Sequence, residues 1–296
     1  MTDNNQQTIP VIEGAGGLLP DYRALIVDLW GVVHNGKTAY EQAVAALTHY
    51  RREVGGTVAL LSNAPRPAAA VADMLDRLKV PTTAYDTILT SGDLTRLEIA
   101  NGDWGEIFLH LGPERDRGVF DGLPLVEGDI DTANFILNTG LFDDDSETPE
   151  DYRELFQVGL SRKMPMVCAN PDIKVMRGDD HIWCAGALAA LYEDMGGKVL
   201  IYGKPHAPTY KAVLRELGLK AGFPLNKSDV LAIGDGLKTD ILGANQAGID
   251  ALLIAGGIHA KELGYSGVGQ LDHEAMNNAM RAAGLDAVAA MTQLSW

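Results

Sequence analysis

Short apolar runs alternate with longer amphipathic stretches through the first and the last parts of the chain. Such runs, without polar interruption, are typical of strands buried on both faces of a parallel sheet. The runs are Ala24–Val27, Thr57–Leu61, Val199–Ile201, Val230–Ile233 and Ala251–Ile254. Helical stretches lie between them, over about 40–54, through Met74 and Leu78, and over about 208–217 and 239–246. This alternation predicts an α/β fold with a doubly wound, Rossmann-like parallel sheet.

The middle of the chain interrupts the alternation. Residues from about 92 to 197 also mix strand-like and helical patterns, but turn-rich segments such as 143–149 separate them. The length of 296 residues exceeds the usual size of one compact domain. The sequence therefore predicts a core formed by residues 21–91 and 198–296, with an inserted α/β cap domain at 92–197. Residues 1–20 are polar and rich in glycine, so we expect them to form a flexible tail.

The composition narrows the range of partners. The formal net charge is −16, whereas nucleic-acid binding needs clustered Lys and Arg, so a small molecule is the expected partner and a nucleic acid is not. No apolar stretch approaches the roughly 20 residues that span a bilayer, which argues against a membrane role. Only Cys168 and Cys184 are present, and no charged start followed by an apolar run precedes the fold, which points to a cytoplasmic, reducing compartment. We expect both cysteines to behave as buried small hydrophobic residues.

Polar side chains follow four of the predicted strands. They are Asp28, Ser62, Lys204 and Asp235, with Asp240 close behind. In an open parallel sheet, ligands bind beyond the carboxyl ends of the strands. A nucleophilic carboxylate, a hydroxyl, a lysine and two further acids are the groups that phosphoryl transfer requires for attack, phosphate binding, charge neutralisation and metal ligation. Carboxylate oxygens suit a hard cation such as Mg²⁺. The sequence has no cluster of His and Cys ligands, which argues against zinc.

These residues lie in segments that resemble the four motifs of the haloacid-dehalogenase superfamily, in the superfamily's order. The segments are Asp28–Gly36, Leu61–Asn63, Tyr202–Pro205 and Gly234–Asp240. Three further segments are similar to the cap of its class IIA branch of p-nitrophenyl-phosphatase and sugar-phosphatase type enzymes: Thr90-Ser91, Ala169–Asp172 and Ala185–Leu188. The resemblance covers residues from about 22 to 265. Each motif alone arises easily by chance, and it is their order and spacing that carry the resemblance.

The resemblance implies a role for each of these residues. Asp28 would be the nucleophile, and Lys204 would bridge the phosphate and Asp28. The residues implied to bind the substrate or its phosphate are Ser62, Asn63, Lys204, Asn170 and Asp172. The groups implied to form the Mg²⁺ site are the side chains of Asp28, Asp235 and Asp240 and the backbone carbonyl of Trp30. The substrate would be a small phosphorylated metabolite, and because cap-mediated dimers are common in relatives of this kind, a homodimer is a further expectation.

One position departs from the superfamily's pattern. Its phosphatases carry an aspartate two residues after the nucleophile, which protonates the leaving oxygen and then activates water, and this chain has Trp30 there. An indole can do neither. Because general acid/base assistance contributes roughly 10²–10⁴ in rate, the substitution predicts weak turnover of poor leaving groups. His34, whose ordinary pKa is near neutrality, is the first candidate to replace the missing acid, although a polar loop histidine is the simpler interpretation.

Two other functions remain open. A non-hydrolytic relative that binds a phosphorylated ligand or a partner protein would explain Trp30. Hydrolysis of a carbon–halogen bond by Asp28 is the third hypothesis, since dehalogenases of the superfamily also lack the second aspartate, but Asp235 and Asp240 would then be superfluous.

Several residues also have simpler structural interpretations. Ser62 has the position of a turn cap, Asp240 suits the first turn of a helix, and Asn170-Pro171-Asp172 is a turn signal. The acids at 143–145 lack the glycine and the distant glutamate of an EF-hand and are interpreted as a solvated turn.

Overall fold

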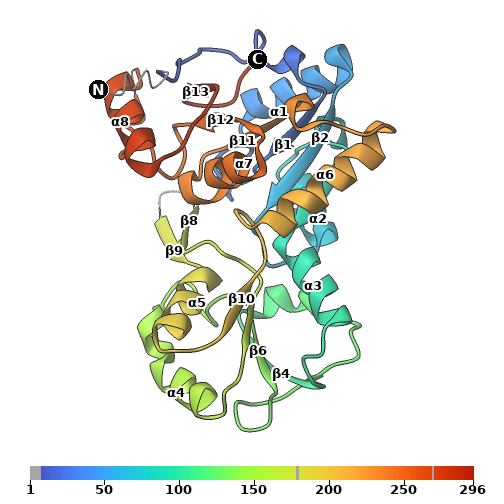
Figure 1. Ribbon diagram of the computed structural model, residues 1–296, viewed down its shortest axis with the longest axis vertical. Coiled ribbons are helices and arrows are strands. Elements are labelled where there is room, and N and C mark those ends of the chain that lie inside the picture. Colours follow the sequence, from blue (N-terminus) through green and yellow to red (C-terminus); the bar gives the residue numbers. More distant parts are fainter. Residues whose placement is uncertain (1–7, 178–179, 269) are drawn as a thin grey trace, which may run out of the picture. The chain divides into compact units, whose positions relative to one another are not determined.

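The computed structural model describes residues 8–177, 180–268 and 270–296. This part of the chain divides into two compact units. The first unit combines residues up to Leu60 with Pro81–Thr87 and Leu214–Trp296, and the second combines Leu61–Val80 with Ile88–Val213. Both units alternate strands and helices, so the predicted α/β class is confirmed (Figure 1).

A parallel sheet contains the strands of the first unit, and residues 61–62 and 88–90 of the same sheet are counted with the second unit. Within the described residues its strand order is β13-β12-β11-β1-β2-β3. The strands are β1 (Ala24–Val27), β2 (Thr57–Ser62), β3 (Thr87–Thr90), β11 (Val230–Gly234), β12 (Asp250–Ile254) and β13 (Ala289–Met291). Ala24 pairs with Thr57 on one side and with Val230 on the other, and β1, β2 and β11 are buried throughout. Chain order and sheet order differ in the way that a doubly wound sheet requires.

The helices of the described residues are α1 (Glu41–His49), α2 (Ala68–Arg77), α3 (Ser91–Asn101), α4 (Arg153–Ser161), α5 (Ala185–Asp194), α6 (Ala207–Ala221), α7 (Leu242–Ala247) and α8 (His273–Ala283). Four of the helices, α1, α2, α6 and α7, lie close to the helical stretches predicted from the sequence. A π-helical turn, η2 (Tyr50–Val54), continues α1, and another, η7 (Leu237–Ile241), precedes α7. The stretch predicted as one helix at 239–246 is therefore a π turn followed by a short α-helix.

The second unit has a parallel sheet of its own. Among the residues that the structure describes, its order is β10-β7-β6-β4-β5. The strands are β4 (Ile107–Leu111), β5 (Val126–Glu127), β6 (Phe135–Asn138), β7 (Met166–Cys168) and β10 (Val199–Ile201), and an antiparallel hairpin adds β8 (Lys174–Arg177) and β9 (Asp180–Trp183). One face packs on α4 and α5 through Phe156 and Leu188. The other face packs on α3 and the turn η4 (Glu114–Val119) through Ile99 and Val119.

The placement of Val199–Ile201 in the core sheet was wrong. This strand, β10, pairs with β7 in the second unit. Three apolar residues have the same pattern in either sheet, so the sequence does not contain the information that assigns them to one. The other domain limits predicted from the sequence remain predictions.

The expectation of a flexible N-terminal tail is also wrong where the structure describes this segment, from residue 8 onward. Val11 bridges to Ala290 on the edge strand β13, and the N–H of Ile12 donates to the carbonyl of Ala290 at 2.9 Å. Ile9 and Ala15 are buried. Because the segment extends an exposed sheet edge, it satisfies backbone groups that would otherwise be unpaired. Residues 1–7 of the predicted tail lie outside the described residues.

The cysteines and the apolar content of the helices are two further points on which the structure can be compared with the sequence. Cys168 and Cys184 are free and buried, as expected. Among the described residues, no helix is both long enough and apolar enough to cross a membrane.

Candidate active site

The loop after β1 places Asp28 at the carboxyl end of the central strand. The N–H of Asp28 donates to the carbonyl of Ile233 on β11 at 2.9 Å, which fixes its backbone to the neighbouring strand. The chain then makes a tight turn in which Val33 and His34 both donate to the carbonyl of Leu29. Asp28 is only 8% exposed. The backbone of Asp28, the nucleophile predicted from the sequence, is thus fixed by a hydrogen bond to the neighbouring strand.

Asp235 follows β11 and is enclosed by two glycines. A Cβ atom on either Gly31 or Gly257 would lie 1.9 Å from Asp235 Oδ2, so both positions require glycine. Gly31 also has a φ of +79°, which favours glycine independently. Asp235 Oδ2 accepts a hydrogen bond of 2.8 Å from the N–H of Ile258. The sequence analysis did not identify the contribution of Gly257 and Ile258, since their segment has no motif beyond a Gly-Gly pair.

Asp240 has the turn-stabilising role that the sequence suggested, and its contact with a metal stays a prediction. Its Oδ2 accepts a hydrogen bond of 3.0 Å from the N–H of Gly236, which stabilises the turn η7. A carboxylate oxygen of Asp240 also lies within 4.8 Å of carboxylate oxygens of Asp28 and Asp235. All three acids are buried. Buried carboxylate oxygens at this spacing, backed by glycines, form the donor set that a hard cation such as Mg²⁺ prefers.

Trp30 is partly exposed and packs on its own loop. Its indole ring lies edge-on to His34, with ring centroids 5.2 Å apart. A Cβ on Gly36 would lie 2.4 Å from the far edge of the indole, so the turn at Gly36 is shaped to accept the ring. The Trp30 ring therefore packs on the turn at Gly36, while the next residue, Gly31, contacts Asp235.

His34 does not have the properties of a general acid. It is fully buried, and its Nδ1 accepts a hydrogen bond from the N–H of Gly36 at 3.0 Å. Burial lowers its pKa to about 4, so the ring is neutral at physiological pH. Its Nε2 has no hydrogen-bond partner within the described residues. A neutral, enclosed imidazole can neither reach a substrate nor donate a proton efficiently.

In the second unit, Ser62 and Asn63 begin a loop that is fixed to the start of α3. The N–H of Ala64 donates to Ser62 Oγ at 3.2 Å, and Ser91 Oγ donates to Asn63 Oδ1 at 3.4 Å. The capping interpretation of Ser62 is therefore correct, yet the same hydroxyl keeps its proton for a ligand. The N–H of Gly92 donates to the carbonyl of Ala64 at 3.1 Å, which pins the loop in place.

Asn63 connects the loop to two other predicted site residues. Its Oδ1 accepts from the N–H of Lys204 at 2.8 Å, and its Nδ2 donates to Asp172 Oδ1 at 2.8 Å. Asp172 is held by an Asx turn, in which its N–H donates to Asn170 Oδ1 at 2.9 Å. Lys204 is 3% exposed. The structure thus brings Asn63, Lys204, Asn170 and Asp172 together, although they lie up to 141 positions apart in sequence.

The predicted site residues form two groups, one in each unit. Asp28, Trp30, Asp235 and Asp240 belong to the first unit, and Ser62, Asn63, Asn170, Asp172 and Lys204 belong to the second. The first group offers three clustered carboxylates, one of which is the predicted nucleophile, and the second offers a hydroxyl and a lysine. A parallel-sheet unit that carries acids at its strand ends, together with a second α/β unit, is the arrangement expected of the hydrolase class whose motifs the sequence resembles.

Comparison with known proteins agrees with this class. Residues 25–123 match the family described as haloacid dehalogenase-like hydrolase, and residues 201–287 match a second family described as HAD-hydrolase-like. The crystal structure of a haloacid dehalogenase-like family hydrolase from Brucella suis 1330 is 44% identical, with a TM-score of 0.85 over 96% of this chain and 100% of that one. This chain belongs to the haloacid dehalogenase-like hydrolase family, and its structural neighbours include class IIA nitrophenyl- and sugar-phosphatase types.

Two curated relatives are more distant. The 5'-nucleotidase YutF of Bacillus subtilis (strain 168) is 25% identical over 245 residues, which cover 81% of this chain and 90% of the relative. The acid sugar phosphatase of Staphylococcus saprophyticus is 21% identical over 245 residues, which cover 82% of this chain and 90% of the relative.

Proposed function

We propose that the protein is a Mg²⁺-dependent phosphatase that hydrolyses a small phosphorylated metabolite through an aspartyl-phosphate on Asp28. The observation that carries the proposal is the gathering of Asp28, Asp235 and Asp240 within 4.8 Å at the carboxyl ends of β1 and β11. Like charges so close and so well buried repel one another strongly unless a cation is bound. The relatives are named as a 5'-nucleotidase and an acid sugar phosphatase, which supports phosphate monoesters as the substrate class.

The chain's own groups account for the attack on phosphorus and for the binding of the phosphoryl group. An oxygen of Asp28 attacks phosphorus, the bond from phosphorus to the leaving oxygen breaks, and a water later cleaves the acyl phosphate and frees Asp28 and phosphate. The Ser62 hydroxyl donates to a phosphoryl oxygen, and Lys204 offsets the developing negative charge. Asn63 orients Lys204 and Asp172 through the hydrogen bonds of its amide. Bound Mg²⁺, held by Asp28, Asp235, Asp240 and the Trp30 carbonyl, would supply electrostatic stabilisation of the transferred phosphoryl group.

The leaving oxygen departs without a proton donor in this mechanism. Trp30 has no transferable proton, and His34 is neutral and buried. The carboxylate and phenolate leaving groups of acyl and aryl phosphates are stable as anions and need no proton donor, so these compounds are the better substrates. Alkoxide leaving groups are less stable, so alkyl phosphates are poorer substrates. We infer a cytoplasmic enzyme, because the two cysteines are free.

Phosphate release from acetyl phosphate and p-nitrophenyl phosphate tests the proposal. We expect release with Mg²⁺, none with EDTA, and none from Asp28→Asn in either condition. Metal-independent release, or release by Asp28→Asn equal to that of the parent, contradicts the mechanism.

A non-hydrolytic binding protein is the second candidate, and the packing of Trp30 favours it. The indole fits the glycine turn at Gly36 closely, so the tryptophan is built into the loop. Thermal stabilisation by phosphorylated compounds, with no phosphate release from any of them, is the outcome that this candidate predicts.

A further inference from the structure

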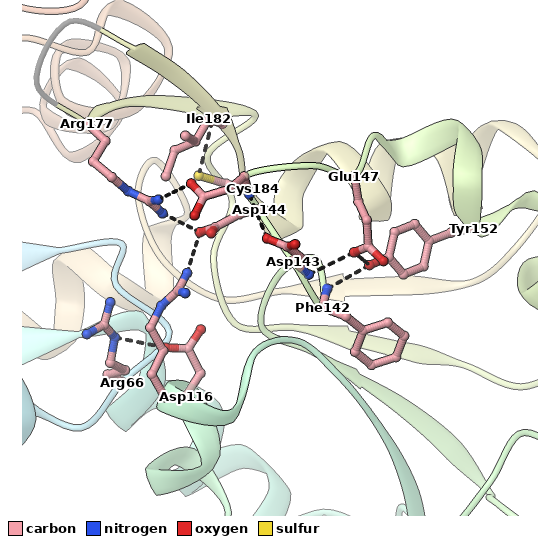
Figure 2. A network of polar contacts seen from close by, with 12 residues as sticks. Arg66, Asp116, Phe142, Asp143, Asp144, Glu147, Tyr152, Arg177, Ile182 and Cys184 are labelled. Atoms are coloured by element: carbon pink, nitrogen blue, oxygen red, sulfur yellow. Dashed lines mark hydrogen bonds and ion pairs between the residues drawn. The ribbon is translucent and has the colours of Figure 1, made fainter.

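Carboxylates also gather in the second unit, but arginines balance them. Carboxylate oxygens of Asp143, Asp144 and Asp145 lie within 4.8 Å of one another. Figure 2 shows the Arg177 guanidinium directed at Asp144, at 2.5 Å, and Arg115 donates to the same carboxylate. The side chain of Asp144 is only 8% exposed, so the solvated turn expected from the sequence is wrong for this residue. The acids of the first unit are therefore the better candidates for a cation.

In the first unit, the loop after β1 folds back on itself and has two faces. His34 pairs with Trp30 and with Ala39, and the Trp30 and His34 rings meet edge-on. Paired residues share a face, whereas successive side chains along a strand point to opposite faces. The residues that follow Trp30 and Ala39, which are Gly31 and Tyr40, therefore lie on the face away from the indole.

This second face is turned toward Asp235. A Cβ atom on Gly31 would lie 1.9 Å from Asp235 Oδ2, so Gly31 contacts this carboxylate directly. Tyr40 shares the face with Gly31 and is half-buried. The charge of Asp235 also acts on Tyr40: burial is the larger cause of the rise in the pKa of the phenol, and Asp235 adds to it. The pairing of the loop and the electrostatics thus agree that Tyr40 lies near Asp235.

Tyr40 is the N-cap residue of α1 but does not cap the helix. N-cap positions favour Ser, Thr, Asp and Asn, whose side chains accept from the free N–H groups of the first turn. The Tyr40 side chain makes no such bond. Its backbone is fixed, because its N–H donates to the carbonyl of Val33 at 2.8 Å and its carbonyl accepts from the N–H of Val44 at 3.1 Å. The helix forgoes a capping side chain here, so a role in the helix does not explain the tyrosine.

The Tyr40 hydroxyl forms no hydrogen bond with any other residue that the structure describes. Because its pKa is raised from a usual value of about 10, the hydroxyl is neutral at physiological pH and keeps its acceptor lone pairs. Where two polar groups act on each other beyond hydrogen-bond distance, a water is the usual link between them. Tyr40 and Asp235 are such a pair.

The chemistry of Mg²⁺ supplies a water of this kind. Mg²⁺ dehydrates reluctantly and usually keeps several water ligands in a protein site. The oxygen of such a water is committed to the metal, so its protons need acceptors in the protein. A neutral hydroxyl is a suitable acceptor.

We propose that Tyr40 is a positioning residue of the metal site, whose hydroxyl oxygen accepts a hydrogen bond from a water ligand of the Mg²⁺ ion beside Asp235. The inference rests on the proposed function, because it requires the Mg²⁺ site. Tyr40 contacts the ion only through the water, so its substitution changes the affinity for the ion. Groups that act on a metal from outside its ligand shell typically change metal affinity by about 10- to 100-fold.

Calorimetric titration of the full chain with MgCl₂ and with CaCl₂ tests this role. For Tyr40→Phe, which removes only the hydroxyl, we expect the Kd for Mg²⁺ to rise about tenfold. The Kd for Ca²⁺ should rise much less, because Ca²⁺ accepts more protein oxygens in a more flexible geometry. A purely structural effect would weaken both cations alike. The unfolding temperature in EDTA should equal that of the parent, since the hydroxyl bonds to no described residue.

Tyr22→Phe is the matched control. Tyr22 also lies beside an acid of the first unit, and its hydroxyl donates to Asp250 Oδ2 at 2.8 Å. Tyr22 precedes β1 and Asp250 begins β12, so this pair lies at the amino ends of the strands, away from the metal site. Tyr22→Phe should keep the Kd of the parent for both cations. Asp235→Asn, which removes a predicted ligand, should weaken the binding of both.

Four results contradict the role of Tyr40: an unchanged Kd for Mg²⁺ in Tyr40→Phe, an equal weakening of Mg²⁺ and Ca²⁺, the same loss in Tyr22→Phe, or failure of Tyr40→Phe to fold. If the parent binds Mg²⁺ and Tyr40→Phe binds it equally well, the proposed function stands and only the inference is rejected. A parent that binds no Mg²⁺ overturns the metal site and the inference together.

Discussion

The two units contain polar clusters built on opposite principles. In the first unit, Asp28, Asp235 and Asp240 bring carboxylates of one sign together within 4.8 Å. In the second unit, Asp144 is shared by Arg115 and Arg177, so each charge has a neighbour of opposite sign. Ion pairs are self-contained, whereas a group of carboxylates gains most from an added cation. Neighbouring acids in the sequence, such as those at 143–145, therefore do not by themselves indicate a metal site.

The largest expected effect is on the Mg²⁺ dependence of phosphate release, which a substitution in the first cluster should change and one in the second should not. Asp235→Asn removes a predicted ligand, and loss of metal stabilisation worth several kcal/mol corresponds to a fall in phosphate release of about 10²–10³. Asp144→Asn, which removes a buried acid from the second unit, should keep the parent's Mg²⁺ activation curve. Phosphate release measured over a range of Mg²⁺ concentrations checks both. An unchanged activation midpoint in Asp235→Asn would show that the metal is held elsewhere.

The next effect is common to both units and concerns stability in acid. Burial lowers the pKa of His34 in the first unit and of His110 in the second to about 4. Between pH 4 and 6.5 the unfolded chain therefore binds a proton at each histidine that the folded chain does not bind. The contribution of each histidine to the free energy of unfolding is complete above pH 6.5. About 3 kcal/mol of it is lost for each histidine as the pH falls toward 4.

Urea denaturation at several pH values measures this loss. His110→Gln and His34→Gln should each reduce the slope of unfolding free energy against pH by about one proton in that window. Slopes are compared because each substitution also changes packing. A parent slope retained in both variants would mean that the histidines are not buried in neutral form.

The sequence predicted the first cluster well and the second poorly, for a physical reason. Asp28 and Asp235 end apolar runs, and the runs determine both the strands and the edge at which the acids meet. Arg115 and Asp144 lie 29 positions apart, and neither follows a periodic pattern. Their pairing depends on how η4 packs, which is tertiary information. Trp30 was recognised as unusual, but its fit to Gly36 depends on a positive φ that no local pattern specifies.

Restoring an acid to the first cluster is the third prediction. Trp30→Asp should increase turnover of alkyl phosphates by up to about 10²-fold, the low end of general acid/base assistance. Removing the indole vacates the surface of Gly36, and loss of a large side chain costs stability, so folded, Mg²⁺-loaded protein must be compared. Phosphate release from Trp30→Ala is the control. If both variants fold, bind Mg²⁺ and release phosphate equally, the missing acid is not the only defect, and the non-hydrolytic candidate becomes the better one.

The smallest effect concerns how much an ion pair in the second cluster contributes to stability. Arg177 donates to Asp144 at 2.5 Å and to Asp145 at 2.7 Å, and its side chain is 30% exposed. Arg177→Gln removes both charge-assisted bonds, but Arg115 still neutralises Asp144. We therefore expect a loss of about 1 kcal/mol, below the usual value for two bonds to charged groups. Arg153→Gln makes the same chemical change at an exposed pair with Glu150, and solvent screening should leave its effect within experimental error.

Urea unfolding of the two variants under identical salt conditions decides this last point. Added salt should reduce the effect of Arg177→Gln only slightly, because the side chain of Asp144 is 8% exposed and its pairs are poorly screened. Equal stability of the two variants would mean that Asp144 is hydrated in solution and that the second cluster is an ordinary surface network.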